Sequence, residues 1–169
     1  DYSNTVLYFS RHANDTTRSL VSRALAHGVQ RDFLQGIKEL RKILKLLRMQ
    51  VLPSSTFSFF LEVIRTRRAL NKIHDVDVLE MKNMESDNVI LAMKILQHGS
   101  VFGWNSDTTF AGLCCLKMIR LTVEHGWCVF TPFALSGYGV CLASLGYEKE
   151  AFRFSQLALR STKGKLAQP

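Results

Sequence analysis

Histidines and cysteines are the residues of this chain whose chemistry could most readily make a metal or catalytic site. The five histidines are His12, His27, His74, His98 and His125. None is spaced four residues from another histidine or from a suitable cysteine, so no local zinc site is predicted. His74, with Asp75 and Asp77 close by, forms the best local cluster, in a segment predicted to be a connector. We therefore predict no metal and no cofactor.

The cysteines predict buried thiols, and no signature of a nucleophile surrounds them. They are Cys114, Cys115, Cys128 and Cys141. No C-x-x-C pair is present, and all four lie in apolar, helix-like sequence typical of free thiols in a reducing compartment. The run Ser136-Gly137-Tyr138-Gly139 is not a G-x-S-x-G elbow and lies within a predicted helix. We therefore predict no catalytic residue and no enzymatic activity.

A basic pattern is the most conspicuous charge feature of the sequence, whose net charge is +8. The possible patch comprises Lys38, Arg41, Lys42, Lys45 and Arg48. Helical spacing places these residues opposite the apolar positions Ile37, Leu40 and Ile43. The patch either faces an anion (a phosphate backbone, a lipid headgroup or an acidic protein) or is a solvated helix face near a helix C-terminus. No aromatic residue interleaves with it, which argues against binding of single-stranded nucleic acid.

The composition indicates one folded domain, residues 1–169. Hydrophobic residues make up 47% of the 169 and charged residues 21%, which excludes wholesale disorder. The sequence begins at Asp1 without an initiator Met, so we expect a piece of a longer polypeptide. No signal peptide and no apolar run of about 18 residues is present, so we expect no transmembrane segment and a cytoplasmic location.

Apolar periodicity predicts about seven helices and no strands. The expected helices are 14–27, 33–49, 55–70, 86–101, 106–126, 133–145 and 148–161. Gly28 is expected to end the first helix, a Gly103-Trp104-Asn105 link the fourth, and Gly146 the sixth. Residues 71–85 are expected to form an irregular connector, with at most a short turn of helix. Thr131 and Pro132 fit the cap and first turn of the sixth helix.

Small residues in the last two predicted helices suggest a repeat. Gly139, Gly146, Ala151 and Ala158 have offsets of 7, 5 and 7, those of the small positions in a tetratricopeptide repeat. Their expected role is to let two helices approach closely. The predicted fold is all-α, with antiparallel hairpins stacked as a short tetratricopeptide-like α-solenoid.

Aromatic residues gather around the predicted fifth helix. They are Trp104, Phe110, Trp127, Phe130, Phe133 and Tyr138. Most are expected to pack in the core, and any that remain exposed would be natural anchors for a bound peptide or helix.

A longer ordered series of motifs resembles one protein family over about residues 15 to 161. The motifs are residues 36–47 followed by Leu52-Pro53, residues 83–87 followed by Ala92-Met93-Lys94-Ile95-Leu96, residues 121–126, 133–139 and 154–159. They resemble the tetratricopeptide-like helices of large signalling ATPases, which follow an AAA-type, STAND-like nucleotide-binding module. Kinase, histidine-kinase or cyclase domains often flank such modules.

The resemblance implies a helical sensor or scaffold arm and not the ATPase itself, and no G-x-x-x-x-G-K-[ST] motif occurs in the chain. We therefore expect a non-catalytic segment that binds a protein partner or other domains of its parent protein. The alternative expectation is a basic helical module that binds nucleic acid or another anionic surface.

Overall fold

The computed structural model describes residues 20–49, 51, 53–70 and 75–165, and this part of the chain is all-α. Eight helices form in it, the first of which includes residues 20–29. The others are α2 (Phe33–Leu46), α3 (Thr56–Leu70), α4 (Asp75–Glu80), α5 (Asp87–Ser106), α6 (Thr108–His125), α7 (Thr131–Ser144) and α8 (Glu148–Lys165). The all-α prediction is confirmed, and α4 is the short helix within the expected connector.

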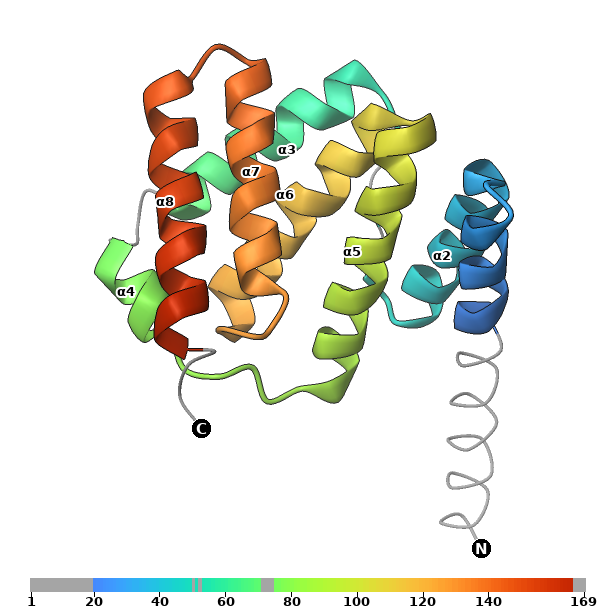
Figure 1. The fold of residues 1–169 in the computed structure, drawn as a ribbon, viewed down its shortest axis with the longest axis horizontal. Coiled ribbons are helices and arrows are strands. Elements are labelled where there is room, and N and C mark those ends of the chain that lie inside the picture. The colour runs from blue at the N-terminus through green and yellow to red at the C-terminus, as the bar shows by residue number, and fades with distance from the viewer. Residues whose placement is uncertain (1–19, 50, 52, 71–74, 166–169) are drawn as a thin grey trace, which may run out of the picture.

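The helices are arranged as successive hairpins (Figure 1). α5, α6, α7 and α8 follow one another with short links, and each packs against the next. α3 packs against α6, α2 against α5, and α4 against α8. Because α3, α5 and α7 all contact α6, this helix is buried on nearly every side. It is the core helix around which α3, α5 and α7 pack.

A single residue connects α5 to α6. Asp107 is the C-cap of α5 and the N-cap of α6, and its carboxylate accepts a hydrogen bond from the Phe110 N–H at 2.9 Å. The predicted Gly103-Trp104-Asn105 link is wrong, because α5 continues through all three residues. A Cβ at Gly103 would lie 2.7 Å from the backbone nitrogen of Ala111. This glycine therefore serves the close approach of α5 and α6 and does not end the helix.

The N-terminal hairpin is held by one aromatic ring. Phe102 of α5 is 6% exposed, and its ring fills the space where a Cβ at Gly28 or Gly36 would lie, 2.6 and 2.9 Å away. Gly28 lies within the 20–29 helix, so the prediction that it ends this helix is wrong. The two glycines let the 20–29 helix and α2 close on Phe102.

The segment that follows α4 is tied to the link between α6 and α7. The Trp127 N–H donates to the Lys82 carbonyl at 2.8 Å, and the Met84 N–H donates to the Trp127 carbonyl at 2.7 Å. These bonds surround an isolated parallel bridge between Asn83 and Trp127. The described part of the predicted irregular connector therefore contains a short helix, α4, and a segment that is hydrogen-bonded to the α6–α7 link.

The hairpin of α7 and α8 follows the sequence prediction closely. Thr131 is the first residue of α7 and not its cap, which is Phe130, while Pro132 lies in the first turn. Gly146 ends the helix as expected, with φ +81°, a conformation that favours glycine.

Candidate functional site

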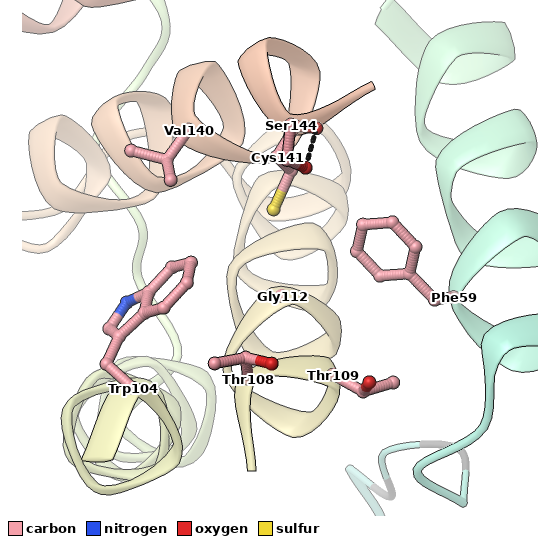
Figure 2. Close-up of a pocket in the computed structure, with 8 residues that line it drawn as sticks. All are labelled: Phe59, Trp104, Thr108, Thr109, Gly112, Val140, Cys141 and Ser144. Atoms are coloured by element: carbon pink, nitrogen blue, oxygen red, sulfur yellow. Dashed lines mark hydrogen bonds between the residues drawn. The ribbon is translucent and has the colours of Figure 1, made fainter. Parts of the chain in front are cut away.

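A surface cavity of about 230 Å³ opens where four helices meet. It is lined by Phe59 of α3, Trp104 of α5, Thr108, Thr109 and Gly112 of α6, and Val140, Cys141 and Ser144 of α7. Figure 2 shows α6 behind the cavity, with Phe59 on one side and Trp104 and Val140 on the other. Among the residues that the structure describes, no charged side chain lines it.

The edge of the cavity is apolar and open to solvent. Trp104 is 42% exposed and Val140 is 48% exposed, although both are large apolar side chains. Among the aromatics predicted around α6, Phe110, Trp127 and Tyr138 are buried and Phe130 and Phe133 half-buried. Core packing is confirmed for most of this group, and Trp104 is the exposed member.

The apolar surface continues from the cavity onto α3. The Phe59 ring meets the Phe60 ring edge-on, with centroids 6.1 Å apart. Phe60 belongs to an exposed row on α3, the α3 face, which we define as Phe57, Phe60 and Ile64. Their spacing of three and four residues places them along one side of the helix. Exposed apolar side chains that adjoin in this way mark a candidate interaction surface.

Cys141 and Ser144 contribute a thiol and a hydroxyl to the lining of the cavity. Its potential nucleophile, Cys141, is 3% exposed, and burial, with a smaller contribution from Cys115, raises its pKa to about 12. The Ser144 hydroxyl donates to the Cys141 carbonyl at 2.8 Å (Figure 2). With this raised pKa the Cys141 thiol stays protonated at neutral pH, and the protonated form is not the nucleophile.

The predicted basic patch is split by the fold. Lys38, Lys42, Lys45 and Arg48 are exposed as expected, whereas Arg41 is half-buried. The Arg41 guanidinium lies 4.3 Å from the Phe110 ring centroid and donates to the Ser54 hydroxyl at 3.0 Å. The prediction that Arg41 faces solvent with the others is wrong, because it lies against α6.

Three of the patch cations have no ion-pair partner in the described part of the chain: Lys38, Lys45 and Arg48. Lys45 lies in the last turn of α2, where the helix dipole favours a cation.

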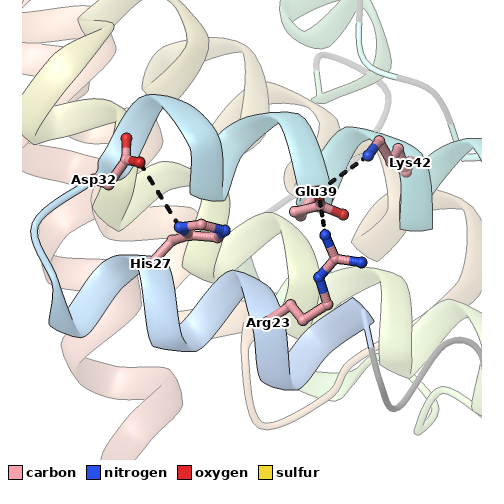
Figure 3. A network of polar contacts seen from close by, with 5 residues as sticks. All are labelled: Arg23, His27, Asp32, Glu39 and Lys42. Carbon is pink, nitrogen blue, oxygen red and sulfur yellow. Dashed lines mark hydrogen bonds and ion pairs between the residues drawn. The ribbon is translucent and has the colours of Figure 1, made fainter.

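Lys42 belongs to a network that the sequence did not reveal (Figure 3). Glu39 is buried, and its Oε1 atom lies 3.0 Å from Lys42 Nζ and 3.5 Å from an Arg23 nitrogen. The hydrogen bond from Lys42 is the main reason that the pKa of Glu39 is lowered, although burial opposes this shift. His27 and Asp32 form a second contact of this hairpin, at 3.8 Å. Glu39 thus joins the 20–29 helix to α2.

A second buried carboxylate attaches α3 to α6. Glu62 is 5% exposed and lies 3.0 Å from an Arg65 nitrogen and 2.9 Å from an Arg120 nitrogen. On the other side of α3, Arg67 pairs with Glu150 at 2.8 Å and covers the Tyr147 ring. These contacts hold α3 in the position that forms the cavity.

The predicted repeat positions pack the α7–α8 hairpin, with one exception. A Cβ at Gly139 would lie 3.1 Å from the Ala151 carbonyl oxygen, and Ala151 and Ala158 are buried. No atom of the described part of the chain lies within 4 Å of a Cβ at Gly146. The expectation of close approach is therefore wrong for Gly146, whose role is the turn.

Two further expectations concern metals and membranes. His74 lies outside the described residues, whereas Asp75 pairs with Arg153 of α8. Within the described ranges, no group of three or more potential ligands could hold a metal ion. None of the helices described is both long and apolar enough to cross a bilayer.

Comparisons with known proteins identify no relative of the chain. No protein-family profile, curated protein or solved structure matches the chain.

Proposed function

We propose that the chain is a non-catalytic scaffold segment that binds another protein or another domain of its parent protein. The observation that carries this proposal is the open apolar cavity between Phe59 and Trp104, which continues into the α3 face. Apolar concave surfaces with exposed aromatic side chains are the usual anchors of protein partners. The protonated, buried Cys141 favours binding over catalysis.

The test is affinity purification of the tagged chain from its source cells, after nuclease treatment, with identification of retained proteins by mass spectrometry. The proposal expects a protein retained in stoichiometric amount by the unchanged chain and lost with Trp104→Ala combined with Phe60→Ser. Retention of the same proteins by both forms, or of none by either, would contradict it.

We propose further that this segment is a tetratricopeptide-like arm of a larger cytoplasmic signalling assembly. The support is the order of motifs that resembles the helical region of signalling ATPases, together with the stacked hairpins from α5 to α8. Sequencing the parent gene on both sides tests this extension. An upstream nucleotide-binding module is expected, and unrelated flanking domains would contradict the signalling role.

A second candidate function is binding of an anionic surface through α2. The specific observation in its favour is that Lys38, Lys45 and Arg48 are exposed and have no ion-pair partner within the described residues. Binding of this kind depends steeply on salt. Retention of duplex DNA at low salt, lost with Lys38→Glu and Lys45→Glu, would support it, and no retention at low salt would exclude nucleic acid as that surface.

A further inference from the structure

We propose that the cavity and the α3 face bind an acidic amphipathic helix, which inserts one large apolar side chain between Phe59 and Trp104. This inference rests on the proposed function and specifies its partner. Three properties of the described surface carry it: the size of the cavity, the shape of the α3 face and the distribution of charge around both.

The size of the cavity favours a side chain over a small-molecule ligand. Its volume of about 230 Å³ is below the range of about 300–1,000 Å³ usual for drug-sized ligands. Its side walls are the apolar residues Phe59, Trp104 and Val140, and none of the described residues that line it is charged. It therefore suits one aromatic or long aliphatic side chain.

The shape of the adjoining surface favours a helix as the source of that side chain. Phe57, Phe60 and Ile64 are 77%, 48% and 48% exposed and form a ridge along α3. Such ridges pack into the grooves between side chains of a second helix. The edge-on contact of Phe59 with Phe60 places the middle of this ridge beside the cavity. An apolar side of a partner helix would cover both.

The charges next to the ridge specify an acidic partner. Arg68 follows Ile64 by one helical turn, is exposed and has no ion-pair partner within the described ranges. Arg65 is also exposed, and its side chain retains 49% of its accessible surface while it pairs with Glu62. The only carboxylate of α3 is this buried Glu62. Carboxylates beside the apolar side of the partner would therefore meet the unpaired charge of Arg68 and the half-exposed guanidinium of Arg65.

The experiment measures binding of three synthetic 18-residue peptides to the full chain by fluorescence anisotropy. The first has leucines at helical i, i+3, i+4 and i+7 spacing and glutamates elsewhere, so that it is acidic and amphipathic. The second replaces every glutamate with lysine. The third has the composition of the first in an order that leaves no apolar side. We expect the first peptide to bind at least about tenfold more tightly than either control.

Substitutions then locate the binding surface. Phe60→Ser and Arg68→Glu should each lower the affinity for the first peptide by about fivefold or more. The matched control for Phe60→Ser is Phe152→Ser, at an exposed position of α8 that does not line the cavity. The matched control for Arg68→Glu is Lys45→Glu on α2. All four positions are exposed, so circular dichroism should show the same helix content in every variant.

Tryptophan emission supplies an independent readout. Trp104 is 42% exposed and Trp127 is 7% exposed, so covering the cavity should shift the emission to shorter wavelength. The shift should disappear in the Trp104→Phe variant. No shift in the unchanged chain at saturating peptide would contradict insertion at this cavity.

Other outcomes would also overturn the inference. One is that the first peptide does not bind up to its solubility limit, or binds no more tightly than the third. The others are tighter binding of the lysine peptide, and a control variant, Phe152→Ser or Lys45→Glu, that weakens binding as much as the substitution to which it is matched. The proposed function would fail separately, if the unchanged chain retained no protein in the affinity purification. A retained partner whose binding is insensitive to Phe60→Ser and Arg68→Glu but sensitive to Trp104→Ala would leave the function standing and this inference refuted.

Discussion

Glu39 shows how a single residue joins two helices. Its buried carboxylate is placed between Lys42 of its own helix and Arg23 of the preceding one. Hydrogen bonds to a charged group contribute about 1.5–3 kcal/mol, and the exposed ends of both cations reduce this by solvent screening. The N-terminal hairpin should therefore depend on the charge of Glu39.

Glu39→Gln should lower the free energy of unfolding at pH 7 by about 1–2 kcal/mol. Because the fold lowers the pKa of Glu39 below its ordinary value of 4.5, the carboxylate contributes fully above about pH 4.5, and the contribution is lost as pH falls through the lowered pKa. Urea titrations at several pH values check this. Glu124→Gln, whose side chain is half exposed and 3.7 Å from Arg120, is the control and should change little. A difference that grows as the pH falls would contradict this role.

The cysteines should be protected from alkylation in the native state. Burial raises the pKa of Cys114, Cys115 and Cys141, in the last case to about 12, and the thiolate is the reactive form. We expect no fast reaction with a maleimide at pH 7.5 and reaction of all four thiols in denaturant. A thiol that reacts rapidly in the native chain, mapped to Cys141 by mass spectrometry, would show that the cavity opens further than the structure indicates.

At the scale of elements, Phe102 sets the position of the N-terminal hairpin. Gly36→Ala would gain about 1 kcal/mol from helix propensity, but its Cβ would lie 2.9 Å from the Phe102 ring. Overpacking costs about 1–3 kcal/mol, so the net effect should be destabilising. Thermal unfolding should show a lower midpoint for Gly36→Ala and little change for Lys38→Ala, on the exposed side of α2. A stabilised Gly36→Ala chain would mean that Phe102 moves aside freely.

Asp107 is the whole connection between α5 and α6. Asp107→Ala removes the cap that accepts the Phe110 N–H, and the loss of an N-cap costs about 0.5–2 kcal/mol. Asp107→Asn keeps an acceptor and should restore most of the stability, as measured by urea unfolding. Equal loss in both variants would show that the charge, and not the cap, is what matters.

The element boundaries that the sequence predicts well are those set by local signals. The start of α8 and the end of α7 follow from Gly146, and the starts of α2 and α3 agree with the prediction to within one residue. The end of α2 does not, because the helix ends at Leu46 and not at Met49. The predicted end of α5 is wrong because the local pattern treats Gly103 as a helix terminator. In the structure Gly103 lets α5 approach Ala111, eight residues away. The same applies to Gly28, whose partner Phe102 lies far along the chain.

Little of the candidate site could be predicted in this way. Trp104 was identified as one of several aromatics, but the sequence gives no sign that it meets Phe59 and Val140 from other helices across a cavity. The burial of Glu39 was also unexpected, because it interrupts a row of cations on a helix that is otherwise amphipathic. Both features depend on contacts between residues distant in sequence.

At the scale of the whole molecule, the stacked hairpins place an apolar surface and a basic one on different helices. The apolar surface lies around the cavity and on α3, and the exposed lysines lie on α2. The net charge of +8 would speed the approach of an acidic partner, while the cavity would determine where it docks.

Site-specific photo-crosslinking in the source cells tests the central claim of a protein-docking surface most directly. A benzophenone side chain would replace Phe60 in one full-length chain and the exposed Phe152 of α8 in another. We predict a discrete protein adduct from position 60 that carries an acidic amphipathic segment at the crosslinked site, and none from position 152. Adducts from position 152 alone, or adducts to nucleic acid in place of protein, would contradict it.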